Sequence, residues 1–244
     1  MGTQMGDRGV EIASEIKTLP QAASWFARFS SPRVIATGFG LSALARLAVA
    51  FGAGSSSALG LRWWDLVAVC TVVALAPFFE WFIHLVILHS RPRALRSITV
   101  DPGAGHREHH RNPATINWVL LRGIDAALFQ VINALVVVVV VVGPMALAGV
   151  PVGAEMVGPV LSGVVAAVAG LGHYEWSHFL FHTAYRPKSR YYRRLKSNHR
   201  LHHWRNERYW LGITSNLGDR VMRTYPASRS AVPLSPTVRS DEPG

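Results

Sequence analysis

One long uncharged segment constrains the fold of this chain more than any other feature. Residues 126–150 read AALFQVINALVVVVVVVGPMALAGV, with Gln130 and Asn133 as the polar interruptions at membrane depth. A β-strand is several times shorter than this segment, whereas a bilayer-spanning helix needs about 20 mostly apolar residues. The segment therefore predicts a transmembrane helix.

Three further segments have the length of membrane spans. Residues 66–88 stay uncharged until Glu80 and His84, residues 156–180 run into histidines, and residues 34–53 contain Arg46. We expect Arg46 to snorkel to the surface or to face the bundle interior. The chain is 50% hydrophobic and 16% charged, which excludes an ordinary soluble domain and a disordered polyelectrolyte. The prediction is an all-α integral membrane protein with four helices in two hairpins and a cytoplasmic helical cap.

Positive charge predicts the orientation of these helices. Of the 25 Lys and Arg residues, 23 lie in residues 1–33, 91–122 and 184–244, on one side of the four spans. By the positive-inside rule both termini are cytoplasmic, and the N-terminus has no cleavable signal pattern. The preference for Arg over Lys favours a GC-rich bacterial genome and hence a bacterial cytoplasmic membrane. We expect a cytoplasmic segment over 1–33, a membrane domain over 34–225 and a disordered tail over 226–244.

Histidine is the residue type that carries the chemistry. A single cysteine, Cys70, excludes an internal disulfide and any cysteine-based metal site. The chain has 11 histidines, and all of them lie in the motifs HLVILH, HREHH, HYEWSH, HFLFH and HRLHH. By number they are His84, His89, His106, His109, His110, His173, His178, His182, His199, His202 and His203.

The spacing of these histidines predicts shared faces on helices. In each HxxHH motif three imidazoles fall within an arc of about 100°, and His178 and His182 also share a face. His84 and His89 are about 140° apart on a regular helix, which makes them poor joint ligands for one ion. One ion uses about four to six ligands, so ten or eleven imidazoles indicate two metal ions. His173 is not needed for ten ligands and is interpreted as a ligand or an outer-sphere group.

In this order and membrane placement, HLVILH, HREHH, HFLFH and HRLHH resemble the fatty acid hydroxylase superfamily, which includes sterol desaturases and carotenoid hydroxylases. The similarity covers about residues 75–226. The resemblance implies two iron ions, with zinc able to occupy the site in isolated protein, and dioxygen as co-substrate. It implies that one ion is held by His89, His106, His109, His178 and His199. The other would be held by His84, His110, His182, His202 and His203.

The resemblance also implies a monooxygenase that hydroxylates an unactivated C–H bond of a lipid, most simply a fatty acyl chain. Removal of a second hydrogen would make it a desaturase. A sterol or carotenoid substrate stays open, because HYEWSH also spells the third box of carotenoid hydroxylases. Electrons would come from a separate ferredoxin or reductase. The partners are thus a lipid, an electron donor and the membrane, with no nucleic acid.

Other residues near the motifs could have a functional role or an ordinary structural one. Aromatic side chains could line a lipid channel or simply pack between helices: Phe78, Phe79, Trp81, Trp176 and Phe179. Asp219 could orient a ligand histidine as a hydrogen-bond acceptor. The basic stretch over 186–200 could contact anionic headgroups or an acidic electron donor, or be a solvated positive-inside segment.

Two classes of protein without oxygenase activity compete with this reading. A membrane cytochrome would place paired histidines deep within the spans, two for each haem. A metal transporter or storage protein would place ionisable groups near the middle of the bilayer.

Overall fold

A computed structural model describes residues 11–52, 61–90, 101 and 103–235. The chain divides into two compact units. The first, here the cap unit, comprises Met1–Phe29, Pro77–Arg122 and Tyr174–Gly244. The second, here the membrane-helix unit, comprises Ser30–Ala76 and Gly123–His173.

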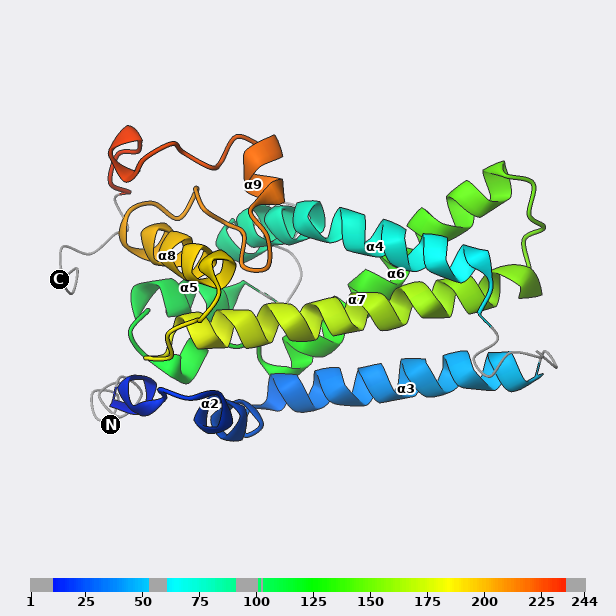
Figure 1. Cartoon of the computed structure of the whole chain (residues 1–244), viewed down its shortest axis with the longest axis horizontal. Helices are drawn as coiled ribbons and strands as arrows, with labels where there is room; N and C mark the ends of the chain where they lie inside the picture. Colours follow the sequence, from blue (N-terminus) through cyan, green and yellow to red (C-terminus); the bar gives the residue numbers. More distant parts are fainter. Residues whose placement is uncertain (1–10, 53–60, 91–100, 102, 236–244) are drawn as a thin grey trace. The chain divides into compact units, whose positions relative to one another are not determined.

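Four long apolar helices dominate the described chain, and Figure 1 shows them as its longest ribbons. They are α3 (Ser30–Gly52), α4 (Trp63–Phe82), α6 (Gly123–Leu147) and α7 (Ala154–Phe181). A π-helix, η1 (Ile83–His89), continues α4. All four are long and apolar enough to cross a bilayer. The all-α prediction is confirmed, and the chain is a multi-pass integral membrane protein.

Helix α6 illustrates how these apolar segments pack in the membrane-helix unit. Val137, Val141 and Met145 recur every four residues and are buried, whereas Val139 is 71% exposed. A Cβ atom on Gly163 of α7 would lie 2.7 Å from a methyl carbon of Val137, so α6 and α7 approach closely because this position is glycine. Such small residues are typical of helix contacts in membranes, where the outward faces stay apolar.

Arg46 faces the interior of the membrane-helix unit. Its side chain is buried on α3 and forms an ion pair of 3.0 Å with the buried Asp65 of α4. Arg46 Nε also donates to Ser162 Oγ of α7 at 2.9 Å, and Ser162 Oγ donates to Asp65 Oδ1 at 2.6 Å. The backbone N–H of Arg62 donates to the second Asp65 oxygen at 2.8 Å. Of the two expectations for Arg46, the interior position is the one observed.

The cap unit is built from shorter helices. They are α2 (Leu19–Phe26), α5 (Ala104–Arg111), the 3-10 helix η3 (Ile116–Trp118), α8 (Arg190–Trp204), α9 (Leu217–Val221) and the 3-10 helix η4 (Arg229–Ala231). Thr18 and Gln21 form a capping box at the start of α2, and Ser189 caps α8 through the Tyr192 N–H. These side chains satisfy backbone N–H groups that a helix start leaves without partners.

An apolar core holds α2 and the end of α7 together within the cap unit. Phe179 is fully buried and packs with Ile16, Leu120 and Phe26. The structure describes residues 226–235, the first part of the predicted disordered tail. Val232 is buried and its carbonyl accepts a hydrogen bond from Arg205 Nε at 2.8 Å. The remaining tail residues, 236–244, lie outside the described residues.

Candidate metal centre

Ten of the eleven histidines converge in the cap unit as two groups of five. Within each group the five ring nitrogens lie within 4.8 Å of one another. Cluster A consists of His84, His89, His106, His110 and His202. Cluster B consists of His109, His178, His182, His199 and His203. This spread is slightly larger than the separation of opposite ligands around one ion, which is about 4.0–4.2 Å for metal–nitrogen bonds of about 2.0–2.1 Å. Small shifts of the rings would bring all five nitrogens to one ion.

The two clusters are neighbours that share secondary structure. Helix α5 supplies His106 and His110 to cluster A and His109 to cluster B. Helix α8 supplies residues to both clusters as well. The rings of His110 in cluster A and His203 in cluster B stack with centroids 4.1 Å apart. Two ions held by these clusters would therefore form one dinuclear centre.

The π-helix η1 explains why His84 and His89 lie in the same cluster. On a regular helix residues five apart diverge, but a π-helix bonds residue i to i+5 and so brings such residues onto one face. The two rings stack with centroids 5.1 Å apart and an interplanar angle of 20°. The expectation that they are poor joint ligands is wrong, because it assumed regular helical geometry through Ile83–His89.

The grouping also corrects the ligand sets that the resemblance implied. His109 lies in cluster B, not with His89 and His106. His202 and His203 were assigned to one ion, yet they lie in different clusters although they are adjacent in the chain. On α8 they point about 100° apart, so each faces a different set of partners.

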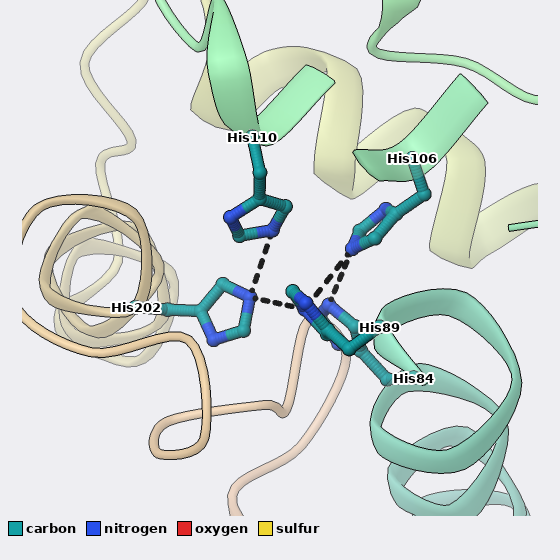
Figure 2. A group of neighbouring side chains, drawn as sticks. All are labelled: His84, His89, His106, His110 and His202. Carbon is teal, nitrogen blue, oxygen red and sulfur yellow. Dashed lines mark hydrogen bonds between the residues drawn. The ribbon is translucent and has the colours of Figure 1, made fainter. Parts of the chain in front are cut away.

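Figure 2 shows the rings of cluster A pointing toward one another from three segments. His84 and His89 come from η1, His106 and His110 from α5, and His202 from α8. His202 Nε2 lies 3.1 Å from His89 Nε2 and 3.2 Å from His110 Nε2, and His106 Nε2 lies 3.2 Å from the Nε2 atoms of both His84 and His89. The Nε2 atoms of cluster A thus face a common centre.

Hydrogen bonding alone does not satisfy these nitrogens. His202 Nδ1 lies 2.9 Å from the Tyr209 carbonyl oxygen, which can only accept, so Nδ1 carries the proton and Nε2 of the neutral ring carries a lone pair. The same holds for His84 against the Leu211 carbonyl at 2.6 Å and for His182 against the Pro113 carbonyl at 2.9 Å. A cation accepts several converging lone pairs at once, so the donor set fits a metal ion in each cluster.

Cluster B has a further polar atom that fits a metal. His178 Nε2 is buried and has no hydrogen-bond partner among the described residues. A buried polar nitrogen without a partner costs free energy. His182 Nε2 lies 3.0 Å from His109 Nε2 and 2.7 Å from His199 Nε2, so the lone pairs crowd together here as well. An ion at this point would offset both costs.

Burial keeps the imidazoles outside the spanning helices neutral. It lowers the pKa of His182 to about 3. Burial, followed by repulsion from neighbouring histidines, also lowers the pKa of others well below the usual value: His106, His109, His110, His199, His202 and His203. A neutral imidazole is the form that binds metals. At neutral pH these imidazoles are therefore in the form that binds a metal ion.

A short loop over residues 209–214, here the carbonyl loop, orients two rings of cluster A. The Tyr209 carbonyl accepts from His202, and the Leu211 carbonyl accepts from His84. Between them, Trp210 is buried with φ of 55°, a left-handed conformation that is strained for a bulky residue. This conformation turns the backbone between the two carbonyls that orient the rings.

Two carboxylates fix the carbonyl loop. Asp219 accepts from the N–H groups of Leu211 at 3.0 Å and Gly212 at 2.7 Å. Glu80 accepts from the N–H groups of Ile213 and Thr214 and from the Thr214 hydroxyl. The Gly212 N–H belongs to the same peptide group as the Leu211 carbonyl, which accepts from His84. Asp219 is therefore linked to His84 through this peptide group, and not by the direct contact that the sequence suggested. Burial raises the pKa of Asp219.

Glu80 and Lys196 also support the site, although neither was predicted as a site residue. Glu80 precedes His84 by four residues, a spacing that places both on one helix face. Lys196 of α8 points inward and its Nζ donates to the carbonyls of Leu180, Thr183 and Tyr185, at 3.3, 2.6 and 2.7 Å. Burial lowers the pKa of Lys196 to about 8. Lys196 thereby ties α8 to the end of α7, where His178 and His182 lie.

His173 and the predicted channel aromatics are not members of either cluster. His173 is exposed on α7 and belongs to neither cluster. Phe179 packs against Phe26 and Phe29, and Trp176 meets Phe26 edge to face with centroids 5.1 Å apart. Trp81 donates from Nε1 to Thr224 Oγ1 at 2.9 Å. Phe78 and Phe79 are partly buried. A channel role for these five aromatic residues stays a prediction.

Four membrane-length helices and two adjacent clusters of buried histidines define a multi-pass membrane metalloenzyme with a dinuclear, nitrogen-ligated site. The Fatty acid hydroxylase family model matches residues 69–224, which include all ten clustered histidines. The chain belongs to this family and is a di-iron oxidoreductase of its type. No curated protein and no solved structure is detectably similar to the chain.

Asp219 offers a test of the carbonyl loop. In Asp219→Asn an amide N–H replaces an acceptor oxygen and faces a backbone N–H of Leu211 or Gly212. We expect the affinity of cluster A for metal to fall roughly 10–100-fold, the usual cost of losing an outer hydrogen-bond partner. Cluster B should change little. Stepwise metal titration of chelator-treated protein measures both affinities, with Glu155→Gln on the exposed end of α7 as control. Equal weakening of both clusters would contradict this role.

Proposed function

We propose that the chain is a monooxygenase that hydroxylates an unactivated C–H bond of a lipid, with a fatty acyl chain as substrate. The balanced reaction is R–H + O₂ + 2 e⁻ + 2 H⁺ → R–OH + H₂O. The observation that carries the proposal is the adjacency of two five-histidine clusters in a chain of the fatty acid hydroxylase family. Two iron ions are the proposed occupants, and zinc is expected to replace them in isolated protein. Bound iron would supply the activation of dioxygen that such a C–H bond requires.

The residues of the chain contribute ligation and orientation. His84, His182 and His202 commit their Nδ1 protons to backbone carbonyls, so each offers an Nε2 lone pair toward its cluster. These three rings therefore act as ligands and not as proton donors. The other rings are held in buried or partly buried positions, which limits access of water to the site.

The position of His173 supports an acyl substrate over a carotenoid. The carotenoid-type reading of HYEWSH uses His173 and His178 as a pair, but His178 instead joins His182 in cluster B while His173 is exposed. A haem protein is disfavoured because five ring nitrogens within 4.8 Å leave no space for a porphyrin between two axial ligands. The distribution of Lys and Arg along the chain supports cytoplasmic termini. The preference for Arg over Lys supports a bacterial cytoplasmic membrane. A separate ferredoxin or reductase is the proposed electron donor.

Expression in a lipid-diverse host tests the function. Lipid extracts from cells with the wild-type chain and with His109→Ala are compared by mass spectrometry. We expect a lipid that gains one oxygen atom with the wild-type chain only. A lipid that loses two hydrogens would make the enzyme a desaturase, and identical extracts in a host that supplies iron and reduced ferredoxin would contradict the proposal. Fragmentation of the product locates the modified carbon and distinguishes acyl, sterol and carotenoid substrates.

A further inference from the structure

Helix α8 carries two opposite faces with different chemistry. Its buried face supplies His202 to cluster A, and His199 and His203 to cluster B. On the opposite face lies a set of residues here called the α8 basic stripe, all of them exposed: Arg190, Arg193, Arg194 and Arg200. The spacing of 190, 193, 194 and 200 keeps these side chains within one side of the helix. The stripe and the ligands are thus separated by a single helix, about 10–12 Å in diameter.

The charge of this surface is not explained by the stability of the helix. No Asp or Glu occurs between Glu175 and Glu207, a segment that contains eight Lys or Arg residues. The first turn of α8 has no acidic residue, although the start of a helix favours negative charge. Arg190, the first residue of α8, therefore stands where the helix dipole disfavours it. This cost, together with the run of cations without an acidic neighbour in the sequence, points to a partner of negative charge.

The composition of the α8 basic stripe favours a protein as its partner over the surface of a membrane. A segment that lies on a membrane combines basic residues with exposed apolar side chains. Across residues 184–204, all of which the structure describes, Tyr191 is the one large hydrophobic side chain that is exposed. At the C-terminal end of the same helix side, Trp204 is partly buried and contacts the His203 ring with centroids 5.7 Å apart. A carrier bound to the stripe would face cluster B across α8 and this indole ring.

We propose that the α8 basic stripe is the docking surface for an acidic one-electron carrier protein of the ferredoxin class. This inference rests on the proposed function, which consumes two electrons in each turnover. In each encounter the reduced carrier loses one electron and the metal site gains one electron, and no covalent bond forms or breaks. Two encounters supply one turnover. Complementary charge is expected to speed association and to make it sensitive to salt.

The test measures binding, not turnover. Full-length metal-loaded protein in phosphatidylcholine nanodiscs is titrated with an oxidised, acidic [2Fe–2S] ferredoxin of the plant type. We expect Arg190→Glu with Arg194→Glu to weaken binding at least tenfold and to reduce its salt dependence. The matched control, Arg208→Glu with Arg229→Glu, makes the same change in charge at exposed residues outside α8 and should stay within twofold of wild type. The milder Arg190→Gln with Arg194→Gln should give an intermediate loss, and metal content verifies that each variant is folded.

Two outcomes would overturn the inference. They are the absence of ferredoxin binding to the wild-type chain and equal losses in the stripe and control variants. Because the carrier is oxidised and no substrate is added, binding remains measurable if the proposed oxygenation fails, and the two failures are distinguishable.

Discussion

Replacing His202 or His203 by alanine is expected to remove different metal ions, although the two residues are adjacent in the chain. His202 belongs to cluster A and His203 to cluster B. Each single variant should retain about one tightly bound ion after dialysis against a chelator, and the double variant should retain none. Product formation should fall by more than the roughly 10–100-fold that loss of an outer-sphere partner costs. Metal analysis of purified protein and lipid mass spectrometry measure the two effects.

The double variant separates the observed clusters from the ligand sets that the resemblance implied. If His202 and His203 bound the same ion, both single variants and the double variant would all retain the other ion. His173→Ala is the matched control, since His173 is exposed and belongs to neither cluster. It should retain two ions and product formation. Loss of metal in His173→Ala would contradict the assignment of ten ligands.

Loss of Asp65 is expected to destabilise the membrane-helix unit more than any exposed substitution. Asp65→Leu leaves Arg46 as a buried charge without its carboxylate, and breaking a buried ion pair in this way costs about 3–5 kcal/mol. Replacing both partners by leucine removes the uncompensated charge, so Arg46→Leu with Asp65→Leu should recover most of the lost stability. Chemical unfolding in detergent–lipid micelles, followed by tryptophan fluorescence, gives the free energies.

The exposed pair Arg62–Glu155 provides the control for this experiment. Its side chains are 47% and 61% exposed, and such pairs contribute about 0–1 kcal/mol. Glu155→Gln should therefore leave the free energy of unfolding nearly unchanged. Should the leucine double variant be as unstable as Asp65→Leu, the network would act through the specific hydrogen bonds of Ser162 and not through charge compensation.

Local sequence patterns predicted the helices and the donor set. Long uncharged runs gave all four membrane helices to within a few residues, because hydropathy and helix length are properties of one segment. The HxxHH motifs predicted joint ligands, since three- and four-residue spacings place side chains on one face of any α-helix. The prediction for His84 and His89 was wrong because the backbone from Ile83 to His89 is a π-helix, and regular α-helical spacing does not apply there.

The membrane spans and the ten histidines able to hold two ions could be predicted from the sequence, because apolar length and ligand type are properties of single segments. The grouping of the rings, the carbonyls that orient them and the pairing of Arg46 with Asp65 became apparent only from the packing of the chain. These features join residues that are distant in the chain, such as His84 and His202. Their meeting depends on how whole helices and the carbonyl loop pack, and no local periodicity encodes that packing.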